Sequence, residues 1–105
     1  MTANIFTQIV NKEVPAEILY EDELCVVIPD KFPKAPIHLL VIPKKNIPSM
    51  KEVQLEDHAL IGHMMIVANE MAKKNNCDGY RLQFNVGEKG GQVIFHLHLH
   101  LMGWL

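Results

Sequence analysis

The sequence predicts a single α+β domain over residues 1–105, with a five-stranded antiparallel sheet, one short helix and one long helix. Hydrophobic residues make up 49% of the 105 residues, which is enough for one core. Apolar residues recur at helical spacing in an early short segment and in a long central one. Short strand-like segments between turns complete the order helix, three strands, helix, two strands.

The chain begins with an amphipathic helix over residues 4–11, for which Asn4 is a suitable N-cap. Its apolar face consists of Ile5, Phe6, Ile9 and Val10. Residues 16–20 and 24–29 are expected to be short strands on either side of a polar turn. Segment 30–36 contains two prolines and is expected to be a loop.

Residues 37–42 form the next expected strand, which is buried on both faces except at His38. The long helix is expected over about residues 54–75. Glu56 and Asp57 lie in its first turn, where acidic side chains suit the helix dipole. Its apolar stripe is broad enough to cover the sheet and also to contact a second subunit.

Residues 80–84 are expected to form a strand, residues 85–92 a flexible glycine-rich loop, and residues 93–102 the last strand. Histidine and leucine alternate in the last strand, and successive side chains of a strand point to opposite faces. One face is therefore expected to be aliphatic and buried, and the other to carry a row of imidazoles. These are His96, His98 and His100.

Composition and charge exclude several classes of function. The net charge is -2 and Arg81 is the only arginine, so the chain lacks the basic surface of a nucleic-acid-binding protein. No apolar stretch is long enough to span a membrane. The N-terminus lacks the features of a signal peptide, so a cytoplasmic location is expected.

Three interpretations of the histidine row are open. A metal ion would need ligands from elsewhere, because alternate strand residues lie about 6.6 Å apart and zinc–nitrogen bonds are about 2 Å long. No further ligand cluster is evident, and neither a metal nor another cofactor is expected. In the other two interpretations the imidazoles are solvated surface groups or bind a phosphate group. In the phosphate interpretation the middle ring, His98, attacks phosphorus while its neighbours orient it and donate hydrogen bonds.

The run from His96 to Met102 resembles the HxHxHxx signature of the histidine-triad (HIT) nucleotide-binding proteins. Other blocks are similar to the nucleoside-phosphoramidase (Hint) branch of that family, and they cover nearly the whole chain in a consistent order. They are Ile5–Phe6, Asp30 with Pro33–His38, Val41–Lys45, Asn85 and Gly90–Gln92.

This resemblance implies a HIT-like fold and a homodimer whose sheet continues across both copies. It implies a purine nucleotide ligand of the AMP or GMP type. It also implies cleavage of purine nucleoside 5'-phosphoramidates or related nucleotidyl substrates through a nucleotidyl-histidine, without a metal.

The resemblance also assigns roles by position. His98 is the nucleophile, His100 contacts the phosphate, and His96 and His38 help to hold the triad. Asp30 accepts hydrogen bonds from the ribose hydroxyls, although from the sequence alone it reads equally well as a turn carboxylate. The base pocket consists of Ile5, Phe6, Ile9 and Ile28, which periodicity alone would place in the core. The positions beside the phosphate or leaving group are Asn85, Gly91, Gln92 and Val93.

The chain departs from the family pattern at several positions. Val93 stands where many relatives carry a hydroxyl that protonates the leaving group or holds phosphate, and general acid assistance is typically worth about 10²–10⁴-fold. Ile28 stands where an aromatic residue is expected, and Pro29 and Lys31 are unusual neighbours of Asp30. Base preference is therefore expected to be loose. Relatives often continue with a tail past the position of Leu105.

The leading hypothesis is therefore a cytoplasmic nucleoside phosphoramidase. A nucleotide-binding module with weak or no catalysis is the alternative, and a metal-binding protein is a third. His58 and His63 share no face of the long helix and are expected to be solvated.

Overall fold

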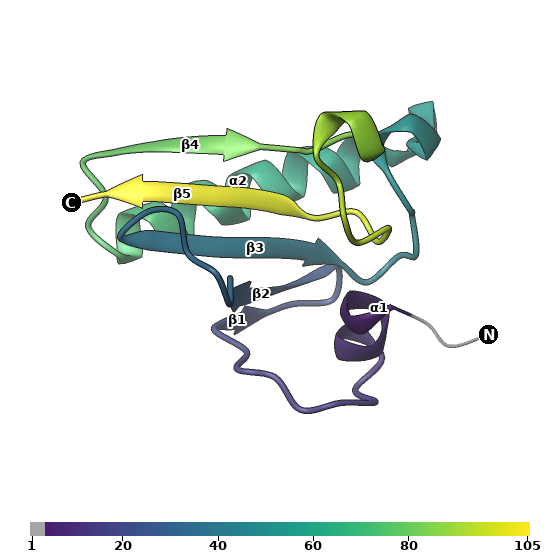
Figure 1. The fold of residues 1–105 in the computed structure, drawn as a ribbon, viewed down its shortest axis with the longest axis horizontal. Coiled ribbons are helices and arrows are strands. Elements are labelled where there is room, and N and C mark those ends of the chain that lie inside the picture. The colour runs from purple at the N-terminus through teal and green to yellow at the C-terminus, as the bar shows by residue number, and fades with distance from the viewer. Residues whose placement is uncertain (1–3) are drawn as a thin grey trace.

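The computed structural model describes residues 4–105 and contains one antiparallel sheet with the strand order β1-β2-β3-β5-β4 (Figure 1). The strands are β1 (Tyr20–Glu21), β2 (Cys25–Pro29), β3 (Ile37–Pro43), β4 (Gly79–Gln83) and β5 (Leu99–Trp104). The α-helices are α1 (Ile5–Val10) and α2 (His58–Lys74). The predicted α+β class, the five strands and the order of the elements are confirmed.

Apolar side chains on both faces of β2 and β3 build two cores, because the side chains of a strand alternate. Val27 and Val41 face the core beneath α2, whereas Ile28 and Leu40 face the core beneath α1. Figure 1 shows α2 lying along one face of the sheet. His38, the expected exception to burial in β3, is itself only 5% exposed.

The N-terminal boundary of α1 was predicted correctly, and that of α2 was not. Asn4 caps α1 by accepting a hydrogen bond from the Thr7 N–H (2.9 Å). A 3₁₀ turn over residues 55–57 precedes α2, because the Asp57 carboxylate accepts a hydrogen bond from the Gln54 N–H (2.9 Å). Asp57 and Glu56 therefore lie before α2 and not in its first turn.

Two predicted strands are shorter than expected. Of the segment 16–20 only Tyr20 lies in a strand, and it belongs to the two-residue β1. The strand predicted over residues 93–102 begins only at Leu99. The Leu97 N–H donates to the Ile47 carbonyl (2.7 Å), which lies outside the sheet ladder. Leu97, Leu99 and Leu101 nevertheless all reach the core beneath α2, as the alternation predicted.

A hydrogen-bonded network joins α2 to the turn between β1 and β2. Asp22 Oδ1 accepts from the backbone N–H groups of Leu24 (2.8 Å) and Cys25 (2.9 Å). Its Oδ2 accepts from the Tyr20 hydroxyl (2.8 Å) and from His63 Nε2 (2.7 Å). The expectation that His63 is solvated is wrong, because its side chain reaches a partner 41 residues away.

Neither helix of the described part of the chain is long and apolar enough to cross a membrane.

The network around Asp22 makes stability depend on pH. Burial acts to raise the pKa of Asp22, but the hydrogen bonds from Tyr20, His63 and the backbone outweigh it and hold the pKa well below its ordinary range. A carboxyl group with a lowered pKa in the folded state stabilises the protein above its unfolded pKa and loses this effect as the pH falls. We expect Asp22→Asn to lower the urea midpoint at pH 7 and to approach the wild type between about pH 5 and pH 2.

Glu23→Gln is the matched control, because it removes the same charge from an exposed neighbouring residue. Urea unfolding of the three proteins across this pH range checks the prediction. Parallel curves for the wild type and Asp22→Asn would show that Asp22 does not link folding to protons.

Candidate active site around four histidines

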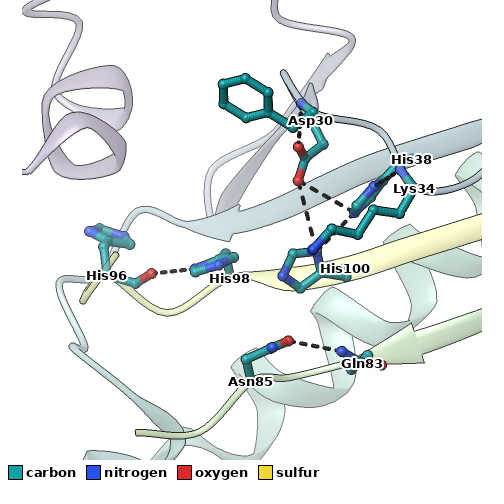
Figure 2. A network of polar contacts seen from close by, with 9 residues as sticks. Asp30, Lys34, His38, Gln83, Asn85, His96, His98 and His100 are labelled. Atoms are coloured by element: carbon teal, nitrogen blue, oxygen red, sulfur yellow. Dashed lines mark hydrogen bonds and ion pairs between the residues drawn. The ribbon is translucent and has the colours of Figure 1, made fainter. Parts of the chain in front are cut away.

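Two of the predicted histidines meet on adjacent strands. His38 lies in β3 and His100 in β5, and His38 Nε2 lies 2.9 Å from His100 Nδ1. Asp30, which directly follows β2, places Oδ2 at 3.4 Å from His38 Nε2 and 4.0 Å from His100 Nδ1 (Figure 2). Asp30 Oδ1 also accepts from the Phe32 N–H (2.8 Å). Asp30 therefore makes the turn contact that the sequence alone suggested, and it also lies beside the two histidines.

Backbone contacts define the protons on this histidine pair. The Lys34 N–H donates to His38 Nδ1 (3.0 Å), so this nitrogen carries no proton. The proton of neutral His38 is then on Nε2, which donates to His100 Nδ1. The proton of neutral His100 must therefore be on its own Nε2, and that N–H is a donor for a ligand oxygen.

In His98 the proton is on Nδ1, whereas in His38 it is on Nε2. His98 Nδ1 lies 2.8 Å from the His96 carbonyl oxygen, which only accepts, so Nδ1 carries the proton. The other nitrogen, Nε2, then keeps its lone pair. The ring of His98 contacts Phe6 (4.8 Å between centroids) and His100 (5.1 Å), both edge-on. The arrangement presents a neutral, positioned imidazole of the kind that attacks phosphorus.

Burial keeps these rings uncharged. It lowers the pKa of His98, and outweighs the His96 carbonyl and the Asp30 charge, which act in the other direction. Burial followed by the charges of His98 and His38 lowers the pKa of His100 to about 4. The pKa of His38 is also lowered, again mainly by burial. At neutral pH the cluster therefore consists of neutral imidazoles beside one carboxylate.

His96 departs from the prediction that three imidazoles share one face of a strand. It precedes β5 and is fully buried. Its Nε2 donates to the Pro43 carbonyl (2.8 Å), and its Nδ1 lies 2.8 Å from Thr7 Oγ1. Burial lowers its pKa, so the ring is neutral and the Thr7 hydroxyl is the donor. Both nitrogens are used inside the protein, and His96 joins α1 to the segment that carries His98.

The predicted base-pocket residues gather on the α1 side of the sheet. Phe6, Ile9 and Ile28 belong to one buried cluster, whereas Ile5 is 44% exposed. Among them Phe6 touches the ring of His98. A cavity of about 370 Å³ opens beside Ile9, but the connection from α1 to β1 lines it and the histidines do not.

Two predicted phosphate-side residues of the glycine-rich loop, Gln92 and Val93, differ in burial. Gln92 is buried, and its amide is used within the protein. Its Oε1 accepts from the Gly87 N–H (3.0 Å), and its Nε2 donates to the carbonyls of Pro48 (2.8 Å) and Ile94 (3.1 Å). Gln92 therefore shapes the loop. Val93 is 86% exposed.

Asn85 and Gly91 lie in close contact in this loop. Gly91 has φ +90°, and a Cβ there would come within 2.8 Å of Asn85 Nδ2, so this position requires glycine. Asn85 Oδ1 accepts from Gln83 Nε2 (3.0 Å), and Figure 2 shows this pair beside His98 and His100. Gln83 pairs with His100 across the two strands, and sequence reasoning missed it. The only available signal was its place at the end of an alternating strand.

The structure also reveals ligand clusters that the sequence did not suggest. The polar atoms of Asp30, His38 and His100 lie within 4.8 Å of one another. A metal on His38 Nε2 would leave the proton on Nδ1, where it would face the Lys34 N–H donor. The cluster is therefore set up for hydrogen bonding and not for a metal. The second cluster consists of Asp22, Cys25 and His63, which belong to the network between α2 and the β1–β2 turn.

Fold and site together define a small α+β protein whose sheet carries a cluster of neutral histidines. A family model described as scavenger mRNA decapping enzyme C-terminal binding matches residues 3–104. An uncharacterized HIT-like protein of Synechocystis is 47% identical over 100 residues, which cover 94% of this chain and 88% of the relative.

Solved structures of HIT proteins have the same fold as this chain. A HIT family hydrolase from Legionella pneumophila superposes with a TM-score of 0.93 at 40% identity, covering 96% of this chain and 92% of that one. A histidine triad protein from Clostridium difficile gives a TM-score of 0.91 at 36% identity, covering 96% and 90%. The chain belongs to the histidine triad (HIT) superfamily and has the fold of its hydrolases and nucleotide-binding proteins.

The buried contact between Thr7 and His96 yields a stability prediction. Thr7→Val keeps the side-chain shape but leaves His96 Nδ1 without a donor. An unsatisfied buried polar group costs about 1–3 kcal/mol, so the free energy of unfolding should fall by that amount. Thr7→Ser keeps the hydroxyl and is the control. Urea unfolding at pH 7 measures the difference, and equal stability of Thr7→Val and the wild type would contradict it.

Proposed function

We propose that this protein is a nucleotide-binding hydrolase that cleaves purine nucleoside 5'-phosphoramidates or related nucleotidyl substrates, with His98 as the nucleophile. The observation that carries the proposal is the hydrogen bond from His98 Nδ1 to the His96 carbonyl, which leaves the Nε2 lone pair available on a neutral ring. Membership of the HIT superfamily supports it independently.

The reaction proceeds in two steps. His98 Nε2 forms a bond to phosphorus and the bond from phosphorus to the leaving nitrogen breaks, while that nitrogen takes one proton from water, which leaves hydroxide, and departs as an amine. The His96 carbonyl accepts the Nδ1–H and so stabilises the positive charge that forms on the nucleotidyl-imidazole. Water then attacks phosphorus, the bond to Nε2 breaks, and a nucleoside monophosphate and one proton are released.

The surrounding residues take the remaining roles in this proposal. His100 donates its Nε2–H to a non-bridging phosphate oxygen, and His38 maintains that tautomer. Asp30 accepts from the ribose hydroxyls, and Phe6 lies nearest the base among the apolar residues of the α1 side. The remaining base-side and phosphate-side positions are Ile5, Ile9, Ile28, Asn85, Gly91, Gln92 and Val93.

A second candidate function is nucleotide binding with weak or no turnover. The exposed side chain of Val93 favours it, because valine has no hydroxyl to protonate a leaving group. Poor leaving groups would then stay attached while the nucleotide still binds. The adduct experiment below separates the two functions.

We also propose a homodimer that forms through β4. This strand lies at one edge of the sheet and has five residues, whereas β1 at the other edge has two. Exposed apolar side chains lie on β4, β5 and α2. They are Met65, Ile66, Tyr80 and Trp104. A free edge beside apolar surface favours pairing with a second copy. The cytoplasmic location stays a prediction.

Trapping the covalent intermediate tests the function. Incubation with a purine nucleoside 5'-phosphoramidate, a quench that avoids acid, and mass spectrometry should show one nucleotidyl group on wild-type protein. His98→Ala should show none and lose turnover, because it lacks the attacking nitrogen. His58→Ala removes an exposed histidine of α2 and should behave as the wild type. Normal turnover by His98→Ala would falsify the proposal, whereas tight AMP binding without adduct or turnover would favour the binding module.

The lowered pKa values give a second test. His98 must be neutral to attack, so kcat/KM should stay high below the ordinary histidine pKa of about 6.5 and fall only in more acidic solution. The Asp30 charge acts to raise the pKa of His98 and His100. Asp30→Asn should therefore move the acidic limb to still lower pH. A limb centred at or above 6.5 in the wild type would contradict the neutral-nucleophile assignment.

A further inference from the structure

The proposed site carries little positive charge for an anionic substrate. The rings of His38, His98 and His100 are neutral because burial lowers their pKa values. Asp30 adds a negative charge beside them. A phosphate group brought to His98 adds another, and placing two like charges in a partly buried site is unfavourable without a nearby cation.

Lys34 is the cation that the fold directs at this site. Its backbone N–H is bound to His38 Nδ1 (3.0 Å), which anchors the residue directly beside the cluster. Figure 2 shows its side chain running along His38 toward His100. The electrostatic effect of Lys34 on both rings agrees with this placement, since its charge acts to lower the pKa of His38 and of His100.

No acidic side chain competes for Lys34, in contrast to several other lysines. Lys12 and Lys44 are paired with Glu21, and Lys45 is paired with Asp57. Among residues 4–105, Lys34 has no ion pair with an acidic side chain. Lys34 is an exposed residue, so a ligand can reach its side chain.

We propose that Lys34 binds the anionic phosphate of the nucleotide and supplies the positive charge that the neutral histidines lack. This inference rests on the proposed function. The Lys34 side chain runs toward His100, so its ammonium group would approach the phosphate from the His100 side. Val93 lacks the hydroxyl that holds phosphate in many relatives. The Lys34 ammonium group would hold phosphate oxygens as well, and so would partly replace that hydroxyl from a different loop. Lys34 therefore discriminates between nucleotides and uncharged nucleosides.

Calorimetry with AMP and with adenosine tests this assignment. Lys34→Met keeps most of the length of the side chain and removes its charge, and should weaken AMP binding about ten-fold, the size of a charge-assisted contact. Adenosine binding should not change. The loss for AMP should shrink at high salt, because an exposed charge is screened. Lys34→Arg should retain most of the AMP affinity, and Lys73→Met, which removes a distant charge at the end of α2, should bind as the wild type.

The outcomes separate this inference from the proposed function. Unchanged AMP affinity in Lys34→Met, with AMP binding and His98 adduct intact in the wild type, would overturn the role of Lys34 and leave the function standing. Equal weakening of AMP and adenosine would show a structural role instead and would also overturn it. Failure of the wild type to bind AMP would overturn both. Lys34→Gln repeats the measurement if the Met variant does not fold.

NMR titration of the free protein gives a readout that needs no substrate. The Lys34 charge acts to lower the pKa of His38 and His100, so Lys34→Met should raise both values relative to the wild type and to Lys73→Met. Unchanged histidine titration in Lys34→Met would show that the ammonium group does not approach the cluster, and would overturn the assignment.

Discussion

Four imidazoles lie in or beside the core of this protein, and each must pair the ring nitrogens that face the protein interior without becoming charged. Burial makes the charged form costly, and an unpaired ring nitrogen is costly as well. The structure meets both demands with backbone groups, whose donor or acceptor role does not change with pH. The Lys34 N–H, the Pro43 carbonyl and the His96 carbonyl each define one tautomer. The remaining contacts follow from these three.

As a result, chemically identical side chains differ in which ring nitrogen stays available to a ligand. His98 is left with a lone pair on Nε2, and His100 is left with an N–H on Nε2. His96 has neither, because both of its nitrogens are bound within the protein. Sequence spacing treats the three as equivalent members of one row. Their different chemistry comes from the partner of the second nitrogen, which is a feature of tertiary structure.

The parts of the fold that depend on local periodicity could be predicted from the sequence. Alternation correctly placed Leu97, Leu99 and Leu101 in the core, and an amphipathic pattern with an Asn cap located α1. Two of the errors, at His96 and His63, fall where a distant partner decides the outcome. His96 leaves the row because Thr7 and Pro43 hold it, 89 and 53 residues away.

A distant partner also explains the error at His63, whereas a local contact explains the late start of α2. His63 was expected to be solvated because no partner is visible on its own helix, but Asp22 accepts its N–H from 41 residues away. The Asp57 carboxylate bonds back to Gln54 and to Lys45, so residues 55–57 form a 3₁₀ turn and α2 starts late. The resemblance implied that His38 supports the triad, but the approach of Asp30, His38 and His100 within one cluster depends on the pairing of β2, β3 and β5.

The loop between β2 and β3 joins the charges of the site to its protons. It carries Asp30 at one end and Lys34 four residues later, and Pro33 and Pro36 restrict its backbone. Asp30 acts to raise the pKa of His100, and Lys34 acts to lower it. A bound phosphate adds negative charge and favours protonation of the nearby rings, whereas a cation opposes that change. A single short loop therefore sets how far the histidines can remain neutral once an anionic ligand is present.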